Sequence, residues 1–310
     1  MEKEMIYKSR SISSCINSAY KLLSDNLKNI VRSTWLPVLL MALFGGIFSV
    51  VNIPNPDILA AGIAHVDAYI GIFVISILAM ILCSIWALSR LMSMLNEQSR
   101  RWNFLRVLLF ALYIFCLSAI IGFLVAGALI LGNRITGGTP QQFLLDNWLV
   151  LLIASIVVIL LMLPLNYIGM RYLYDKDARF WLDLPRTYKT GLRHLGFIFL
   201  TTLLASLIIG VIVLVVSIPL GILNIANLVS LSGLAIGDEA GLPRYFLPLL
   251  FVTTVLVTMV LWFAYVFEIL VYLFMYGSIE KQEEEHRKID TPTAPEPPSD
   301  DPHLPLQRLN

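Results

Sequence analysis

The residues that could perform metal or hydrolytic chemistry are few in this sequence and lie far apart along it. No two of the four histidines, His65, His194, His286 and His303, lie within helical reach of one another. The three cysteines have no close spacing, and an odd number does not form a disulfide framework. His-Glu-x-x-His, Cys-x-x-Cys, Gly-x-Ser-x-Gly and Walker A sequences do not occur. Because such chemistry needs convergent ligands or acid–base groups, we expect no catalytic residue, no bound metal and no cofactor.

Glu268 is the one acidic residue well inside a long apolar segment. A charge at the middle of a membrane helix costs ~2.5–3.5 kcal/mol, so it usually has a partner. Glu268 falls ~33 Å along its segment, near one end, and Arg90 ends another segment at similar depth. The sequence therefore predicts a Glu268–Arg90 ion pair or shared polar pocket, to which Asn166 and Tyr167, beside Pro164, could contribute. The alternative is a carboxylate that reaches the lipid headgroups.

The composition indicates that lipid surrounds most of the chain. Apolar residues make up 58% of the 310 residues and charged residues 14%, against ~45–50% and ~25% in soluble domains. With a mean hydropathy of +0.79, this composition excludes a soluble enzyme, a disordered chain and a disulfide-stapled secreted domain. The net charge of +1 argues against nucleic acid as a partner.

Six segments are long and apolar enough to cross ~30 Å of hydrocarbon as helices. They are residues 35–53, 68–89, 107–132, 147–170, 195–223 and 246–275. If the chain crosses six times, 20 Lys and Arg residues lie on one side of the membrane and 2 on the other. The positive-inside rule then places both termini in the cytoplasm.

Two further segments are amphipathic and adjoin spans on the cytoplasmic side. Residues 12–31 and residues 180–195 repeat apolar residues at three- and four-residue steps, with polar residues opposite. We therefore predict an all-α membrane helix bundle with six transmembrane helices and two amphipathic helices on the cytoplasmic face. Its parts are an N-terminal segment (1–32), a transmembrane domain (33–277) and a Pro-rich tail (278–310) that we expect to be disordered.

The segment Ala-Tyr-Lys-Leu-Leu-Ser-Asp-Asn-Leu (residues 19–27), which leads into a span, resembles a loose group of uncharacterised bacterial six-helix membrane proteins. The group is similar to the membrane domain of glycerophosphoryl diester phosphodiesterases. The resemblance implies the bacterial inner membrane and transfers no catalytic residue, because that chemistry belongs to a separate soluble domain.

Three functions stay open on the sequence alone. The first is a non-enzymatic protein that organises the membrane, handles lipid or serves a partner complex, with membrane lipids and other membrane proteins as partners. The second is a transporter of small solutes or lipids, which would need a polar site or broken helices. The third is an intramembrane enzyme that modifies lipids. A cavity above ~300 Å³ lined by Glu268, Asn166 and Tyr167 would favour transport.

Overall fold

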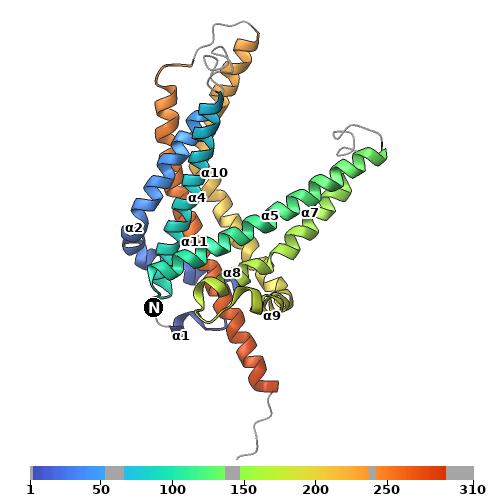
Figure 1. Ribbon diagram of the computed structural model, residues 1–310. Coiled ribbons are helices and arrows are strands. Elements are labelled where there is room, and N and C mark those ends of the chain that lie inside the picture. The colour runs from blue at the N-terminus through green and yellow to red at the C-terminus, as the bar shows by residue number, and fades with distance from the viewer. Residues whose placement is uncertain (1–2, 53–65, 137–146, 237–241, 291–310) are drawn as a thin grey trace, which may run out of the picture.

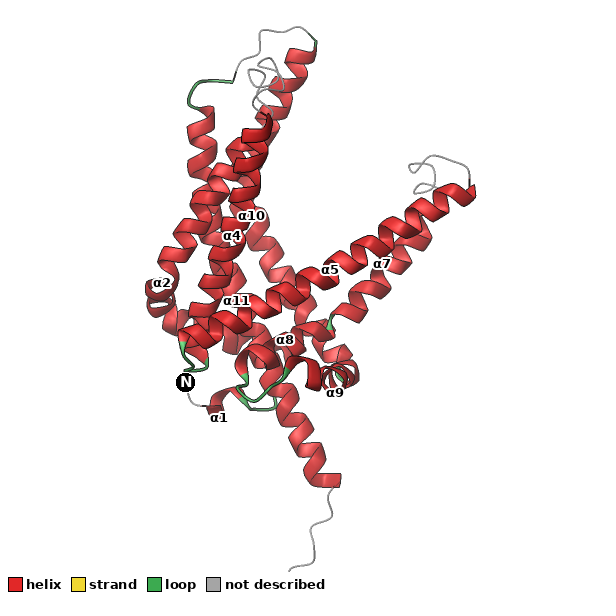
Figure 2. Ribbon diagram, viewed as in Figure 1, coloured by secondary structure: helices red, strands yellow, loops and turns green. Residues whose placement is uncertain are grey.

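The computed structural model describes residues 3–52, 66–136, 147–236 and 242–290. These residues form helices and contain no strand (Figure 2), so the predicted all-α class is confirmed. The helices are α1 (Lys3–Ile6), α2 (Ile12–Val51), α4 (Val66–Leu95), α5 (Arg100–Thr136), α7 (Trp148–Met162), α8 (Pro164–Tyr174), α9 (Phe180–Arg193), α10 (Leu195–Ala235) and α11 (Phe246–Asp290). Six helical stretches within them are long and apolar enough to span a membrane, and each contains most of one predicted span.

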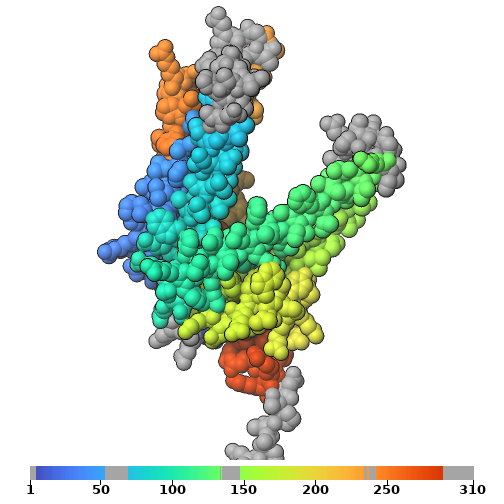
Figure 3. Space-filling view, in the orientation of Figure 1, coloured from blue at the N-terminus to red at the C-terminus, as the bar shows by residue number. Residues whose placement is uncertain are grey.

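The spans divide into a bundle and an arm. Helices α2, α4, α10 and α11 run side by side, whereas α5 and α7 diverge from them (Figure 1). We call α5 and α7 the arm; it projects from the bundle as a separate ridge (Figure 3). The buried core is concentrated where α2, α4, α8 and α11 meet, near the end that carries the N-terminus.

The apolar surface of the arm is not buried by other described parts of the chain. No residue of α7 is buried, and on α5 the ring of Phe123 is 81% exposed. Apolar surface on this scale is unfavourable in water at ~25 cal/mol per Å² and is stable against lipid tails. The exposed arm therefore agrees with a multi-pass membrane protein.

The basic segments gather at one end of the molecule. The start of α1, the turn between α4 and α5, helices α8 and α9, and the end of α11 share this basic end (Figure 1). An even number of spans produces this arrangement, because each pair of crossings returns the chain to the same side.

Helix boundaries differ from the predictions at three places. The first amphipathic segment and the first span form one helix, α2, so the predicted boundary at residue 32 lies inside it. The fourth span breaks at Leu163 into α7 and α8, because Pro164 cannot donate an N–H to the preceding turn. Helix α10 extends beyond residue 223, with Pro219 inside it.

The prediction of a disordered tail from residue 278 onward is wrong for its first part. Helix α11 continues to Asp290, ~20 Å beyond the predicted end of the sixth span. Ion pairs from Lys281 and Lys288 to Glu284 brace this extension along its surface. Ser278 also accepts a hydrogen bond from the backbone N–H of Arg10 (2.9 Å), which ties the helix to the N-terminal segment. Residues 291–310 lie outside the described residues.

Candidate functional site

A groove of about 720 Å³ lies between the end of α4 and the start of α5. Its walls are apolar and include Trp86, Phe104 and the half-exposed Leu82 and Leu105. Three arginines also line it: Arg90 from α4, and Arg100 and Arg101 from α5. We call this cavity the α4–α5 groove. It combines an apolar wall with positive charge at the basic end, and this combination is complementary to the acyl chain and the phosphate of a phospholipid.

The arginines of the α4–α5 groove have no anionic partner among the described side chains. None of them forms an ion pair, and no carboxylate lines the groove. The Arg90 guanidinium lies 5.4 Å from the Trp86 ring centroid and makes one long hydrogen bond to the Ser33 carbonyl (3.4 Å), while its buried Nε has no acceptor. Because a buried charged donor normally has a partner, the Nε of Arg90 is a donor that an anion in the groove could use.

A polar network in the turn between α4 and α5 positions these arginines. The side-chain amides of Asn96 and Asn103 each donate to the other's oxygen, at 2.7 and 3.0 Å, and Asn96 also donates to the Leu173 carbonyl of α8. The Ser99 hydroxyl accepts from the Trp102 backbone N–H and so caps the start of α5. The turn thus holds Arg90 and the pair Arg100 and Arg101 on facing helices.

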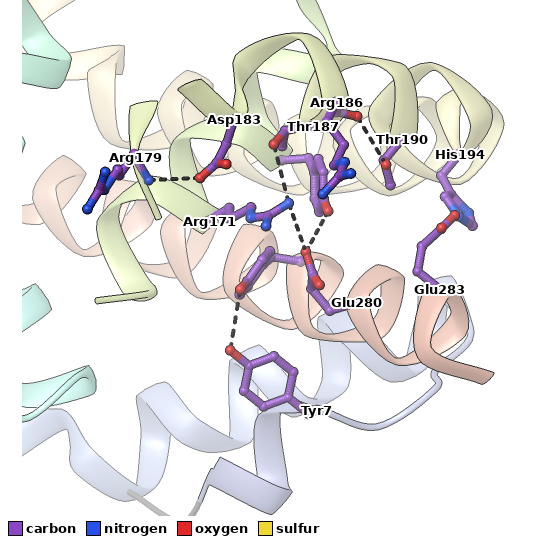
Figure 4. Close-up of polar contacts among 12 residues, drawn as sticks. Tyr7, Arg171, Arg179, Asp183, Arg186, Thr187, Thr190, His194, Glu280 and Glu283 are labelled. Carbon is purple, nitrogen blue, oxygen red and sulfur yellow. Dashed lines mark hydrogen bonds and ion pairs between the residues drawn. The ribbon is translucent and has the colours of Figure 1, made fainter. Parts of the chain in front are cut away.

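A second cavity, of about 380 Å³, lies between α8, α9 and the end of α11. Its charged lining comprises Arg171, Arg186, Arg287, Glu280 and Glu283; hydroxyls of Tyr167 and Thr190 complete it. We call it the mixed-charge pocket, and Figure 4 shows Arg171, Arg186, Glu280 and Glu283 converging between the helices. It is polar where the α4–α5 groove is apolar.

Glu280 joins α11 to α8 in this pocket. The buried Tyr167 hydroxyl donates to Glu280 Oε1 at 2.6 Å, and Arg171 Nη1 lies 3.8 Å from the same oxygen. Arg171 Nη1 also donates to Thr187 Oγ1 of α9 (3.3 Å), so one guanidinium links all three helices. These contacts fix the back wall of the mixed-charge pocket.

Glu283 closes the other side of the pocket, one turn further along α11. Its Oε1 lies 2.9 Å from His194 Nε2 and accepts from Arg193 Nη1 at 3.1 Å. Partial burial acts to raise the pKa of the Glu283 carboxyl, but the His194 hydrogen bond and the Arg193 charge outweigh it, so the pKa lies below its usual value. Glu283 is therefore held as a carboxylate beyond the sixth span.

The loop between α8 and α9 is held by Arg106 of α5. Its guanidinium donates to the carbonyl oxygens of Tyr172, Asp175 (2.5 Å), Lys176 (2.8 Å) and Ala178 (3.0 Å). Arg106 also lies over the Trp102 ring, 4.0 Å from its centroid. A cation at the C-terminus of a helix stabilises its free carbonyls, so Arg106 holds the end of α8 and the loop that leads to α9.

The four predicted site residues do not share one site, and the predicted Glu268–Arg90 ion pair is absent. Glu268 accepts a hydrogen bond from the Tyr272 hydroxyl of its own helix (2.6 Å), whereas Arg90 turns toward α2 and the α4–α5 groove. Similar depth placed the two residues together in the prediction, but they lie on helix faces that point to different neighbours. Tyr167 lines the mixed-charge pocket; Asn166 lines neither cavity.

The sequence reasoning missed Arg171, Glu280, Glu283 and Arg186 as pocket residues. Spacing contained part of the signal, since Tyr167 and Arg171 are four residues apart and Glu280 and Glu283 three apart, which places each pair on one helix face. The spacing of Glu280 and Glu283 was not used, because the polar end of α11 was predicted to be disordered and not helical.

No group of three or more His, Cys, Asp or Glu side chains able to hold a metal ion occurs among the described residues. No family model, curated protein or solved structure matches the chain. The resemblance to bacterial six-helix membrane proteins therefore stays a prediction, and the two cavities are the features of the described residues that bear on function.

Proposed function

We propose that this protein is a non-enzymatic, lipid-handling membrane protein that holds an anionic phospholipid in the α4–α5 groove. The observation that carries the proposal is the set of three arginines without carboxylate partners at an apolar groove. The lipid phosphate binds Arg90, Arg100 and Arg101, and an acyl chain lies along Trp86 and Phe104.

The groove suits such a ligand in size and in access. Small-ligand sites occupy ~300–1,000 Å³, and the groove measures about 720 Å³. Leu82 and Leu105 are both more than half exposed, so the apolar wall opens toward the surrounding lipid. A lipid can therefore enter sideways from the bilayer without crossing water.

The proposal includes the bacterial inner membrane as the location, with both termini in the cytoplasm. The excess of Lys and Arg at the basic end supports this orientation. The groove then faces the cytoplasmic leaflet, where anionic lipids attract basic residues with ~1 kcal/mol per Lys or Arg.

Transport has weaker support. Substrate sites of secondary transporters lie near the bilayer midplane, whereas both cavities described above lie at the basic end. The mixed-charge pocket exceeds ~300 Å³, but of the three residues expected in a transport site it is lined by Tyr167 and by neither Glu268 nor Asn166.

Lipid titration of the purified protein in detergent tests the proposal. Fluorescent short-chain phosphatidylglycerol and phosphatidylcholine are compared by anisotropy with wild type and with the double variant Arg100→Gln/Arg101→Gln. At ~1 kcal/mol per arginine, the double variant is expected to bind phosphatidylglycerol ~30-fold more weakly. Arg32→Gln, an exposed arginine of α2 that does not line the groove, is the matched control and should change little. Equal affinity for the two lipids, or an equal loss in the control, would refute the proposal.

A further inference from the structure

We propose that the mixed-charge pocket binds a small zwitterion that carries a phosphate and a primary ammonium group, the chemistry of phosphoethanolamine. The pocket is separate from the α4–α5 groove, because it lies between α8, α9 and α11 and shares no lining residue with it. The inference therefore stands independently of the proposed phospholipid site.

The arginines that line the pocket, which we call its cationic wall, include hydrogen-bond donors that have no acceptor among the described residues. Figure 4 shows Arg186 reaching from α9 toward α11, and its side chain makes no hydrogen bond or ion pair with a described residue. The buried Nε of Arg171, on α8, likewise has no acceptor. Arginine presents five donors in a planar fork that matches phosphate, so the two side chains together can hold a phosphate group.

The two glutamates that line the pocket, which we call its acidic wall, can accept further hydrogen bonds. A carboxylate can accept about four hydrogen bonds. Glu280 uses Oε1 for both Tyr167 and Arg171, and its other oxygen makes no hydrogen bond or ion pair with a described residue. Glu283, also in the lining, is held in its charged form by His194 and Arg193. These two carboxylates can accept the hydrogens of a primary ammonium group.

The combination of the two walls selects the ligand class. A simple anion would meet two carboxylates, and a simple cation would meet three arginines; either would lose part of what it gains through like-charge repulsion. A ligand with both charges satisfies both walls at once. The volume of about 380 Å³ admits a headgroup-sized molecule and is small for a whole lipid.

Such a zwitterion has two sources, a lipid headgroup or a free solute. Trp181 and Leu182 on α9 are 73% and 71% exposed, and apolar side chains of this kind insert an amphipathic helix into the membrane interface. The pocket is thus close enough to headgroups for either source to reach it.

Isothermal titration of the detergent-purified full chain tests the inference, with phosphoethanolamine, inorganic phosphate, ethanolamine and phosphocholine as probes. Phosphoethanolamine is expected to bind at least ~10-fold more tightly than any other probe, because only it makes charge-assisted hydrogen bonds to both walls. Arg186→Gln should weaken it by ~10-fold or more, whereas Lys189→Gln, an exposed lysine of the same helix outside the lining, should not.

Failure to bind phosphoethanolamine, equal binding of inorganic phosphate, or an equal effect of Lys189→Gln would overturn the inference. Nanodiscs then identify the source: competition from phosphatidylethanolamine indicates a lipid headgroup, and binding of the soluble probe without competition indicates a free solute. Either result supports the zwitterion site. The variants Arg100→Gln/Arg101→Gln leave this binding unchanged even if the phospholipid proposal fails.

Discussion

Replacing Arg106 with alanine is expected to release the loop between α8 and α9. The guanidinium donates to four carbonyl oxygens of residues 172–178. Hydrogen bonds to charged groups contribute ~1.5–3 kcal/mol each, so four sum to at least ~6 kcal/mol; partial exposure and non-additivity reduce this by about half. We therefore expect the loop to open with a free energy ~3 kcal/mol lower than in the wild type.

Amide hydrogen exchange of residues 175–183 measures this opening directly. In the wild type, the Asp175 N–H donates to the Arg171 carbonyl of α8, and the N–H groups of Asp177 and Arg179 donate to the side chains of Asp175 and Asp183. A loss of ~3 kcal/mol predicts ~100-fold faster exchange there, while amides in the middle of α10 stay protected. Arg106→Lys should recover only part of the protection, because an ammonium cannot span four carbonyls in a planar fork.

Arg101→Ala is the matched control, since Arg101 is exposed on the same helix and makes no side-chain hydrogen bond with a described residue. The reasoning fails if Arg106→Ala leaves exchange in residues 175–183 unchanged. It fails equally if Arg101→Ala produces the same acceleration, because the effect would then come from lost positive charge and not from the four hydrogen bonds.

Two further predictions concern α11. Gly277→Ala should lower stability by ~1–3 kcal/mol, because the new Cβ would overlap the backbone oxygen of Ile6; thermal unfolding checks this, and Gly210→Ala, where a Cβ has open space, should not lower the midpoint. Glu283 has a lowered pKa, so its contribution to stability is complete above its ordinary pKa near 4.5 and is lost as the pH falls through the lower folded value. The difference in thermal midpoint between wild type and Glu283→Gln should therefore be constant at neutral pH and shrink toward pH ~3; a difference that does not change with pH would contradict the assigned pKa.

The sequence was sufficient for the six apolar helices, and it contains, at Pro164, the local cause of the break in the fourth span. These features follow from local chemistry: hydrocarbon requires backbone hydrogen bonds to close within each helix, and proline cannot supply one. The amphipathic pattern of residues 180–195 likewise predicted α9, because a helix at an interface must separate its apolar and polar faces.

The helical end of α11 could not be predicted from the local sequence. Residues 278–290 are polar and precede a Pro-rich stretch, so composition alone indicated disorder. In the folded chain, Glu280 meets Tyr167 and Arg171, and Glu283 meets His194 and Arg193. The sequence positions of these partners are about 90–110 residues away, and no periodicity within one segment reports contacts over such a separation.

The sequence by itself determined that the chain is helical, multi-pass and strongly basic on one side, because these properties depend on hydrophobicity, helix length and the distribution of charge along the chain. Only the tertiary structure decided that Arg90 faces a groove with Arg100 and Arg101 instead of pairing with Glu268, and that Tyr167 joins a mixed-charge pocket. The physical reason is that a helix can rotate about its own axis without changing the depth of its residues in the membrane. The depth of a residue therefore follows from its position along the span, whereas the neighbour that it faces depends on how the helices pack.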